Sequence, residues 1–430
     1  MKIHKVTNIE SFVTKILPKQ PQNNKKIVES ILKDIQKNGD SAVKKYEKKF
    51  TGAKLTSLRV SKTEIIQAYS KVSKKEISAI RLAKIRVEKT ESVVKSIFKN
   101  KIINHDGIKV SKKFLAIQST GCYIPGGLAQ YPSSVIMSVI PAKIAGVKKI
   151  VVVSPPNPDG QINPLTIVTA DICGATEIYK TGGVQAIGAL SYGTKSISKV
   201  DKIVGPGGAF VTLAKFSVSD TTGIDMLAGP TELGIIADNS VNPKFLALDL
   251  ISQAEHSADT FCYLITNSEK IAKQVNKLIL ELIPTIQRRD LVKSSLSKNG
   301  FIAVCKNNSD MIKLVNSLAP EHLQIMAKNP KLFSSKITTS GLVLLGNYSP
   351  SSASDYILGS NHILPTNGFG KTRGSLSVMD FIKINTEVTA SKSSLIKISK
   401  HLDVLTQSEG LPNHYEAVRG RLEWKKIGLN

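Results

Sequence analysis

Two histidine-containing stretches bring metal-binding and proton-transferring groups close together in the sequence. In the first, Gln253 and His256 lie three residues apart near the end of an expected helix, so their side chains share one face. An amide oxygen and an imidazole nitrogen are ligands that suit zinc. Further ligands would have to come from elsewhere, and Asp355, His362 and His414 are the candidates. The alternative is a histidine that only interacts with the dipole at its helix end.

The second stretch is the pair Glu321-His322, which directly follows Pro320. An adjacent carboxylic acid and imidazole could divide acid–base work between them. On spacing alone, a surface pair at the boundary of an element is the favoured interpretation.

Cys122 lies beside a glycine-rich turn, but no His or Asp lies nearby in the sequence to activate its thiol. We therefore interpret Cys122 as a small buried residue.

Glycine-rich turns at 121–127, 182–183 and 205–208 follow expected strands. Glycines between a strand and a helix let the backbone approach a phosphate at the helix N-terminus. None of the turns matches the dinucleotide-binding or P-loop glycine pattern, so each could equally be a tight turn. Their repetition at what should be one edge of one sheet favours a nucleotide-binding crevice.

The elements that must position these groups change in character along the chain. Residues 24–100 have the spacing of helices, whereas after residue 115 helices alternate with short apolar runs that lack polar alternation. We expect strands at 150–153, 176–179, 202–204, 233–237, 261–265, 301–304 and 342–345. Such strands, separated by helices, indicate parallel sheets covered on both faces, and therefore an α/β fold of the doubly wound type.

Composition excludes several classes of protein. The chain has 430 residues, of which 41% are hydrophobic and 21% charged, as in globular proteins of two or three domains. No apolar stretch is long enough for a membrane helix, and the N-terminus lacks the apolar block of a signal peptide. The four cysteines show no CxxC pairing. These features predict a cytoplasmic protein without membrane association.

The chain is strongly basic, with 59 Lys and Arg residues against 33 Asp and Glu, a formal charge of +26. Nucleic-acid binding is one explanation. However, the excess is mostly lysine spread along the whole chain, and aromatic residues make up only 5%. We therefore favour a solvated lysine-rich surface and expect no nucleic-acid partner.

Together, the motifs resemble those of the histidinol dehydrogenase family from about residue 25 to 425. The matching segments are 121–127, 141–146, 182–187, 200–207, 224–232, 249–256, 320–322, 355–366, 376–381 and 409–414. The resemblance implies oxidation of L-histidinol to L-histidine, the last two steps of histidine biosynthesis, through bound L-histidinal and with NAD. It also implies one Zn²⁺ per subunit, a homodimer, and two incomplete Rossmann-like parallel-sheet domains with small helical terminal segments.

The expected domains follow from this resemblance. They are an N-terminal segment at 1–22, a first Rossmann-like domain at 23–122 plus 231–375 that carries the zinc and acid–base residues, a second, NAD-binding Rossmann-like domain at 123–230, and a C-terminal tail at 376–430 that is exchanged between subunits.

The resemblance also assigns roles to single residues. His322 corresponds to the general base and Glu321 to the carboxylate that activates water on the aldehyde. The implied zinc ligands are Gln253, His256, Asp355 and His414, with His414 and Glu409 supplied by the second subunit. The implied substrate-binding residues are Thr231, Gln253, His256, His322, Asp355, Glu409 and His414, and the implied NAD-binding residues are Tyr123, Gln185 and Gly208.

Two positions depart from the family pattern. Gly208 stands where the family has an Asn that touches NAD, and Ser354 stands where Gly is usual. Loss of one hydrogen bond would weaken NAD binding by about 0.5–1.5 kcal/mol unless another contact replaces it. We expect the change at Ser354 to be tolerated.

Two other functions remain as alternatives. A paralogue on the same scaffold could oxidise another polar primary alcohol, such as a sulfonated diol. Glu409 favours the first function, because a carboxylate suits a cationic amino group better than a sulfonate. A basic nucleic-acid-binding protein that had lost catalysis would show decayed motif residues, which this sequence does not.

Overall fold

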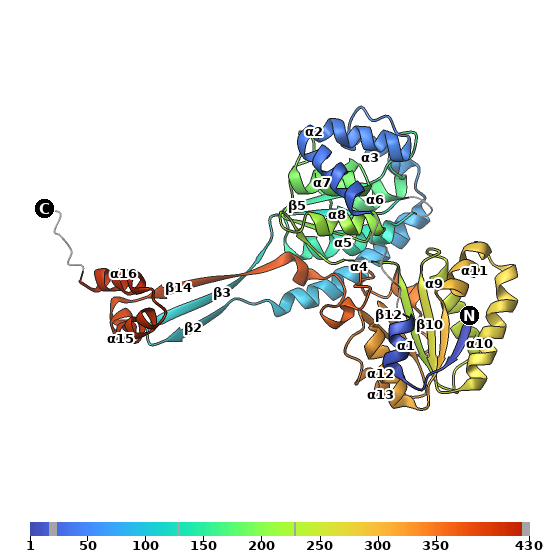
Figure 1. The fold of residues 1–430 in the computed structure, drawn as a ribbon. Coiled ribbons are helices and arrows are strands. Elements are labelled where there is room, and N and C mark those ends of the chain that lie inside the picture. The colour runs from blue at the N-terminus through green and yellow to red at the C-terminus, as the bar shows by residue number, and fades with distance from the viewer. Residues whose placement is uncertain (17–23, 127–129, 228, 424–430) are drawn as a thin grey trace. The chain divides into compact units, whose positions relative to one another are not determined.

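The computed structural model describes residues 1–16, 24–126, 130–227 and 229–423 (Figure 1). The chain divides into two compact units. The first comprises Met1–Lys95 and Ile117–Phe381, and the second comprises Ser96–Ala116 and Ile382–Asn430. Mixed helices and parallel sheets in the first unit confirm the expected α/β class. Within the described ranges, no helix has the length and apolar character that crossing a membrane requires.

The first unit contains a six-stranded, all-parallel sheet in the order β1-β11-β10-β9-β12-β13. Its strands are β1 (Lys2–Lys5), β9 (Glu232–Ala237), β10 (Phe261–Thr266), β11 (Phe301–Val304), β12 (His322–Met326) and β13 (Leu342–Leu345). Every residue of β9, β10, β11 and β12 is buried, as expected of parallel strands covered on both sides. Strand β12 was not predicted, because polar His322 and Gln324 interrupt its apolar run.

Successive side chains of β10 belong to different buried clusters, so both faces of this sheet are covered. Leu264 packs in one cluster with residues from α9 (Pro243–Ala254), α10 (Glu269–Leu282) and α11 (Arg289–Lys298). Tyr263 packs in the other with residues from α12 (Asn308–Leu318), α13 (Pro330–Ser334) and α1 (Ile9–Ile16). Helix α14 (Ser351–Ser354) follows β13. The arrangement is the doubly wound one that the sequence predicted.

A second all-parallel sheet has the order β6-β5-β4-β7-β8. Its strands are β4 (Ser119–Tyr123), β5 (Lys149–Ser154), β6 (Glu177–Lys180), β7 (Lys202–Val204) and β8 (Gly223–Ile224), and its helices include α5 (Pro132–Ala145), α6 (Pro164–Cys173), α7 (Gly183–Tyr192) and α8 (Ala209–Ser217). The three glycine-rich turns follow β4, β6 and β7. They therefore lie at the carboxyl edge of one sheet, as the sequence predicted; residue 127 of the first turn lies outside the described residues.

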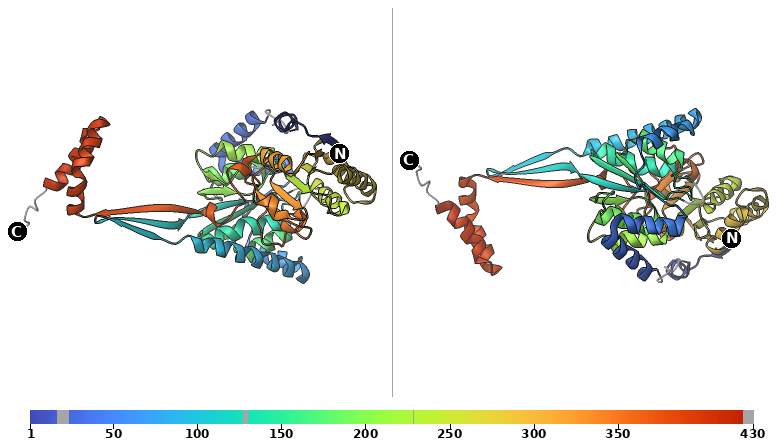
Figure 2. Two further views of the ribbon diagram at one scale, coloured as in Figure 1. Left: turned by 90° about the horizontal axis from the view of Figure 1, so that it is seen from below. Right: turned by 90° about the horizontal axis from the view of Figure 1, so that it is seen from above.

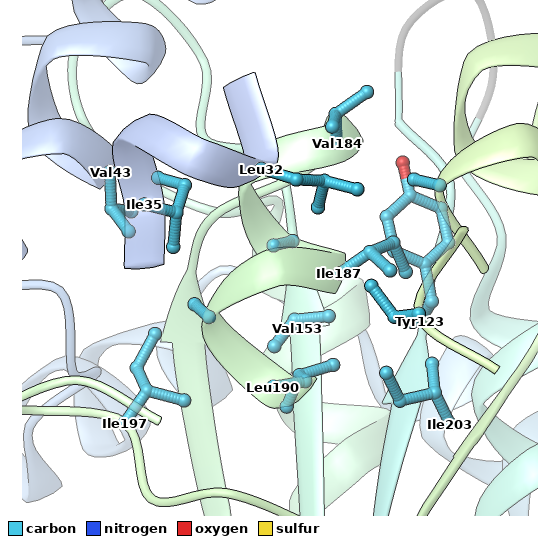
Figure 3. Close-up of a cluster of buried hydrophobic side chains, with 14 of the residues drawn as sticks. Leu32, Ile35, Val43, Tyr123, Val153, Val184, Ile187, Leu190, Ile197 and Ile203 are labelled. Carbon is cyan, nitrogen blue, oxygen red and sulfur yellow. The ribbon is translucent and has the colours of Figure 1, made fainter. Parts of the chain in front are cut away.

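The N-terminal part of the chain packs differently from our expectation. The predicted domain at 23–122 plus 231–375 would group α2 (Lys25–Thr51) with the six-stranded sheet. Instead, Leu32 and Ile35 of α2 pack against Ile187 and Leu190 of α7 in the core of the five-stranded sheet (Figure 3). The apolar stripe of α2 indicates that one face is buried, but it does not specify the partner.

Two neighbouring segments also differ from those domain bounds. Helices α3 (Lys62–Ser70) and α4 (Lys74–Ile97) follow α2, and α3 contacts α6 beside the five-stranded sheet. The expected separate segment 1–22 instead supplies β1 to the six-stranded sheet, where it pairs with β11; its residues 17–22 lie outside the described residues.

The second unit is a three-stranded antiparallel ribbon followed by two helices (Figures 1 and 2). It consists of β2 (Lys101–His105), β3 (Ile108–Ala116), β14 (Ile382–Ala390), α15 (Lys392–Ser408) and α16 (Pro412–Glu423). Strand β14 was not predicted within the helical tail. Among the described residues of this unit, the buried side chains are those of Ser394, Ser399 and Thr406, all of them polar. The ribbon and its helices therefore bury no apolar core of their own.

Candidate active site

The predicted acid–base pair lies at the amino edge of the six-stranded sheet. His322 is the first residue of β12, and Glu321 directly precedes it. Only 7% of Glu321 and 2% of His322 is exposed, so the surface-pair interpretation that spacing alone favoured is wrong. Because β12 pairs with β9 on one side and β13 on the other, the backbone of both residues is held by a rigid sheet.

A third buried acid, Glu232, is bound to this pair. Glu321 Oε2 accepts a hydrogen bond from the Glu232 backbone N–H at 2.8 Å, and Glu232 Oε2 accepts one from the Glu321 N–H at 3.3 Å. The Asn367 N–H donates to Glu232 Oε1 at 2.8 Å. Burial, together with nearby Glu321, raises the pKa of Glu232 to about 8. We predicted no role for Glu232 from the sequence, although it lies in the motif at 224–232.

The His322 imidazole lies between carboxylates. Its Nδ1 is 3.3 Å from the Glu232 carbonyl oxygen and 3.6 Å from Glu321 Oε2, and its Nε2 is 3.2 Å from Asp355 Oδ1. Burial lowers the pKa of His322, but the negative charges of Glu321 and Asp355 outweigh it and raise the pKa to about 10. Burial would raise the pKa of Asp355, but His322 holds it below its usual value. These groups form one coupled proton-binding cluster.

Three of the predicted zinc ligands meet beside this cluster. Gln253 and His256 lie at the end of α9, and Asp355 directly follows α14. His256 Nε2 and Asp355 Oδ2 are 4.0 Å apart. Ligand atoms bound at about 2.1 Å to a tetrahedral zinc ion are about 3.4 Å apart, so these two atoms lie within about 0.6 Å of the spacing that a shared ion requires.

The Gln253 amide, near the same helix end as His256, has one polar atom without a partner among the described residues. Ser351 Oγ donates to Gln253 Oε1 at 3.3 Å, and the buried Gln253 Nε2 has no hydrogen-bond partner among the described residues. Turning the amide by 180° places its oxygen on the unpartnered side and lets Nε2 donate to Ser351 Oγ. Gln324 fixes this region, because its Oε1 accepts from Ser351 N at 3.0 Å and its Nε2 donates to Asp249 Oδ2 at 2.8 Å.

The other candidate ligands lie elsewhere. Both ring nitrogens of His362 have neighbours. Nδ1 is 2.7 Å from the Asp355 carbonyl oxygen and Nε2 is 3.3 Å from Ser134 Oγ, so His362 holds the backbone of Asp355 in place. Glu409 caps the end of α15, and His414 lies in the first turn of α16; both are exposed and belong to the second unit. Across the described ranges, no group of three or more His, Cys, Asp or Glu side chains is arranged to hold a metal. The zinc site therefore stays a prediction.

The predicted cofactor residues all lie at the carboxyl edge of the five-stranded sheet. Tyr123 ends β4, Gln185 lies in the first turn of α7, and Gly208 is the N-cap of α8. Tyr123 Oη accepts a hydrogen bond from the Gly183 N–H at 3.1 Å. A Cβ added at Gly208 would meet no atom within 4 Å, so the amide side chain of the family pattern would have room there.

Other residues near this edge have structural roles. A Cβ at Gly205 would approach the Tyr123 carbonyl oxygen to 2.2 Å, so the close packing of these two turns requires glycine. Lys215 and Asp225 form a buried ion pair beneath the turn, and Asp225 Oδ2 accepts from Gly205 N at 2.8 Å. Cys122 is fully buried, and burial raises its pKa to about 12, which confirms the interpretation as a buried residue.

Thr231, expected to bind substrate, immediately precedes β9. Its carbonyl oxygen accepts from the Phe261 N–H at 2.9 Å, and its side chain is partly exposed. It thus lies at the same amino edge as Glu321 and His322, one residue before Glu232.

The whole chain is similar to known proteins. The sequence profile of the family described as histidinol dehydrogenase matches residues 17–422. The chain is 42% identical over 425 residues to the histidinol dehydrogenase of Methanocaldococcus jannaschii, covering 98% of each chain, and 43% identical over 395 residues to that of Methanococcus maripaludis, covering 92% of each. The crystal structure of histidinol dehydrogenase from Elizabethkingia anophelis has a TM-score of 0.93 at 37% identity and 98% coverage of both chains. The similarity therefore includes residues of both units.

Proposed function

The chain belongs to the histidinol dehydrogenase family, and from this premise we propose that it oxidises L-histidinol to L-histidine with NAD, through L-histidinal that stays bound. The observation that carries the proposal is the buried cluster in which the His322 imidazole lies between Glu321 and Asp355. Such a cluster can accept and return protons away from bulk water. The proposed reaction consumes two NAD and one water and yields histidine, two NADH and protons.

In the first oxidation, His322 in its neutral form takes the proton from the alcohol oxygen as hydride leaves the carbon for the nicotinamide. Glu321 and Asp355 raise the pKa of His322 to about 10, and the positive charge of zinc bound at Asp355 would lower this pKa so that the neutral base forms. The carboxylates of Glu321 and Asp355 stabilise the imidazolium that forms. Glu321 then removes a proton from the water that adds to the aldehyde. Departure of the second hydride from the resulting hydrate gives the carboxylic acid, again with proton loss to this cluster.

Gln253, His256 and Asp355 of one subunit would hold zinc together with His414 of the partner subunit. The 4.0 Å separation of the His256 and Asp355 donor atoms and the unpartnered Gln253 amide support this assignment. When bound, zinc would supply an anchor for the imidazole and amine of the substrate and a positive charge that lowers the pKa of neighbouring groups. Gln324 and Ser351 keep the ligands in place.

The second unit supports a homodimer. Its ribbon and helices bury no apolar side chain among the described residues, and a three-stranded sheet of this kind is not stable without a covered apolar face. Its exposed apolar side chains include Ile102, Ile103, Ile384, Val388, Ile396, Val404, Leu405 and Leu411. We propose a second copy of the chain as the cover, with Glu409 and His414 completing the partner's site.

The four cysteines are all unpaired, which agrees with a cytoplasmic location.

The test is NADH formation from limiting L-histidinol with excess NAD, before and after chelation and after zinc is restored. The proposal predicts two NADH for each histidinol, loss of activity on chelation and recovery with zinc. One NADH for each histidinol would remove the water-activating role of Glu321. No NADH from folded, zinc-loaded protein would favour another alcohol, and a sulfonated diol is the first to try.

A further inference from the structure

A carboxylate from helix α2 binds the N-terminus of α7, at the carboxyl edge of the five-stranded sheet where the predicted cofactor residues lie. Glu47 of α2 is 0% exposed, and a single oxygen, Oε1, accepts three hydrogen bonds. The donors are Thr181 Oγ1 at 2.8 Å, the Gly182 N–H at 2.9 Å and Gln185 Nε2 at 2.8 Å. Glu47 therefore contacts both the glycine turn and a residue expected to bind the cofactor.

This contact fixes the orientation of the Gln185 amide. An amide NH₂ can donate to a carboxylate, whereas an amide oxygen would be repelled by it. Gln185 Oε1 must therefore face away from Glu47. Gln185 Oε1 and Glu47 Oε2 are both buried, and neither has a hydrogen-bond partner among the described residues. Buried acceptors without donors are costly, so the missing partners are N–H or O–H groups.

The same contacts make this helix N-terminus unsuitable for a phosphate. The Gly182 N–H is already bound to Glu47, and the Gly183 N–H is bound to Tyr123 Oη. The Glu47 carboxyl group occupies the place where an anion would interact with the helix dipole. A neutral ligand group that both donates and accepts would instead match Gln185 Oε1 and the Tyr123 hydroxyl.

We propose that Glu47 is a positioning residue of the cofactor site, which holds Gln185 so that Oε1 accepts a hydrogen bond from an uncharged N–H or O–H group of the dinucleotide and which opposes a phosphate there. The proposal rests on the proposed use of NAD. Three groups of NAD have this chemistry: the carboxamide of the nicotinamide, the ribose hydroxyls, and the adenine amine with its neighbouring ring nitrogens.

The test compares the full-length, zinc-loaded wild type with Glu47→Gln. An amide at this position cannot ionise, and its oxygen holds the Gln185 amide less firmly than a carboxylate oxygen does. We expect the KM for NAD to rise about tenfold, as for one lost hydrogen bond, with kcat changed less than about twofold. The preference for NAD over its 2′-phosphorylated form should fall as well.

Glu91→Gln is the matched control. Glu91 is also a buried glutamate of the first unit, and its carboxylate accepts from the Val378 N–H at 2.7 Å. Burial raises the pKa of both glutamates, so the two substitutions perturb folding in similar ways. Glu91→Gln should leave the KM for NAD unchanged. An equal rise of KM in both variants would show a structural effect and overturn the proposal.

Gln185→Met tests the same acceptor with Glu47 in place, and should raise the KM for NAD as much as Glu47→Gln does. Because both substitutions remove one contact, the double variant should show no additional rise. An additive rise, or an unchanged KM in Glu47→Gln, would contradict the proposal. Should Glu47→Gln not fold, an unchanged KM in Gln185→Met alone overturns it.

An analogue distinguishes the carboxamide from the other donor groups of NAD. Acetylpyridine adenine dinucleotide lacks the carboxamide N–H. If the carboxamide is the donor, Glu47→Gln should not raise the KM for this analogue. If a ribose hydroxyl or the adenine amine is the donor, the rise should equal that for NAD. Wild-type protein that makes no NADH from histidinol would refute the proposed function only. A calorimetric NAD titration of wild type and Glu47→Gln would still test the role of Glu47, with equal Kd values contradicting it.

Discussion

The two parallel sheets of the first unit are alike in their cores but carry their polar groups at opposite edges. At the amino edge of the six-stranded sheet, Glu232 and Glu321 are bound by each other's backbone N–H groups. At the carboxyl edge of the five-stranded sheet, the donor is a backbone N–H at the N-terminus of a helix, and it binds Glu47. In both places, the end of a strand or helix leaves backbone N–H groups without a backbone partner. These N–H groups donate to a carboxylate and so allow it to be buried.

The comparison separates two kinds of chemistry. The amino edge concentrates titratable groups around His322, whereas the carboxyl edge offers glycine turns, an amide and a phenol. The rule that ligands bind beyond the carboxyl ends of parallel strands predicts the second edge. It does not predict the first, because the acid–base residues lie at or just before the amino ends of their strands.

The largest expected effect comes from removing a proposed ligand at the amino edge. Asp355→Ala should lose zinc and activity together, because Asp355 would both bind the ion and balance His322. Metal analysis of purified protein, alongside kcat, measures both losses. Normal zinc content in this variant would show that Asp355 is not a zinc ligand.

His322→Asn tests whether the two edges act separately. Loss of a general base should lower kcat by about 10²- to 10⁴-fold. NAD affinity, measured by calorimetry, should stay within about twofold, because the cofactor contacts belong to the other sheet. His401→Asn, at an exposed position of α15, serves as the control. A parallel loss of NAD affinity would show that the edges are not independent.

Stability at the amino edge should depend on pH through Glu232. Its folded pKa of about 8 lies above the unfolded value of about 4.3, so the folded state binds one more proton between these values. The stabilising contribution of this group is present below about pH 4.3 and is lost as the pH rises to 8, by up to about 1.4 kcal/mol per pH unit.

Glu232→Gln should remove this slope. Urea unfolding at pH 5, 6.5 and 8 should show the variant gaining stability relative to the wild type as the pH rises. Glu281→Gln, at an exposed position, should show no such trend. A constant difference across the three pH values would mean that Glu232 is ionised in the folded protein.

The smallest effect is expected at the carboxyl edge, from Gly208→Asn. The position has an ordinary extended backbone, with φ −66°, and open space around it. An Asn there can hydrogen-bond NAD and strengthen its binding by up to about tenfold, and as an N-cap it should stabilise α8 by a few tenths of a kcal/mol. Gly208→Ala, which lacks the amide, should leave the Kd for NAD unchanged. Equal effects of both substitutions would argue against an Asn contact.

The sequence predicted most parallel strands because continuous apolar runs are typical of strands buried on both faces. It could not predict that α2 packs on the five-stranded sheet, because an apolar stripe shows that a helix face is buried but not which element covers it. Glu47 was missed because it lies in the run Lys-Lys-Tyr-Glu-Lys-Lys, which reads as a solvated helix face. Its spacing of four residues from buried Val43 was the available signal.

At the site, the sequence predicted Glu321, His322, Gln253, His256 and Asp355, but not Glu232, whose carboxylate accepts from the Glu321 backbone N–H and whose carbonyl oxygen faces His322. Glu232 begins a buried strand, and only the pairing of β9 with β12 brings its backbone N–H to Glu321. Pairings between strands that lie far apart in the sequence are not encoded in local spacing. The pKa shifts that they cause could therefore not be predicted.

The most direct test is a crystal structure of the purified protein with zinc, NAD and L-histidinol. The account predicts zinc between His256 Nε2 and Asp355 Oδ2, completed by His414 of the partner subunit. It also predicts the dinucleotide at the carboxyl edge of the five-stranded sheet, in contact with Gln185. Zinc bound elsewhere, or a dinucleotide at the amino edge of the six-stranded sheet, would contradict it.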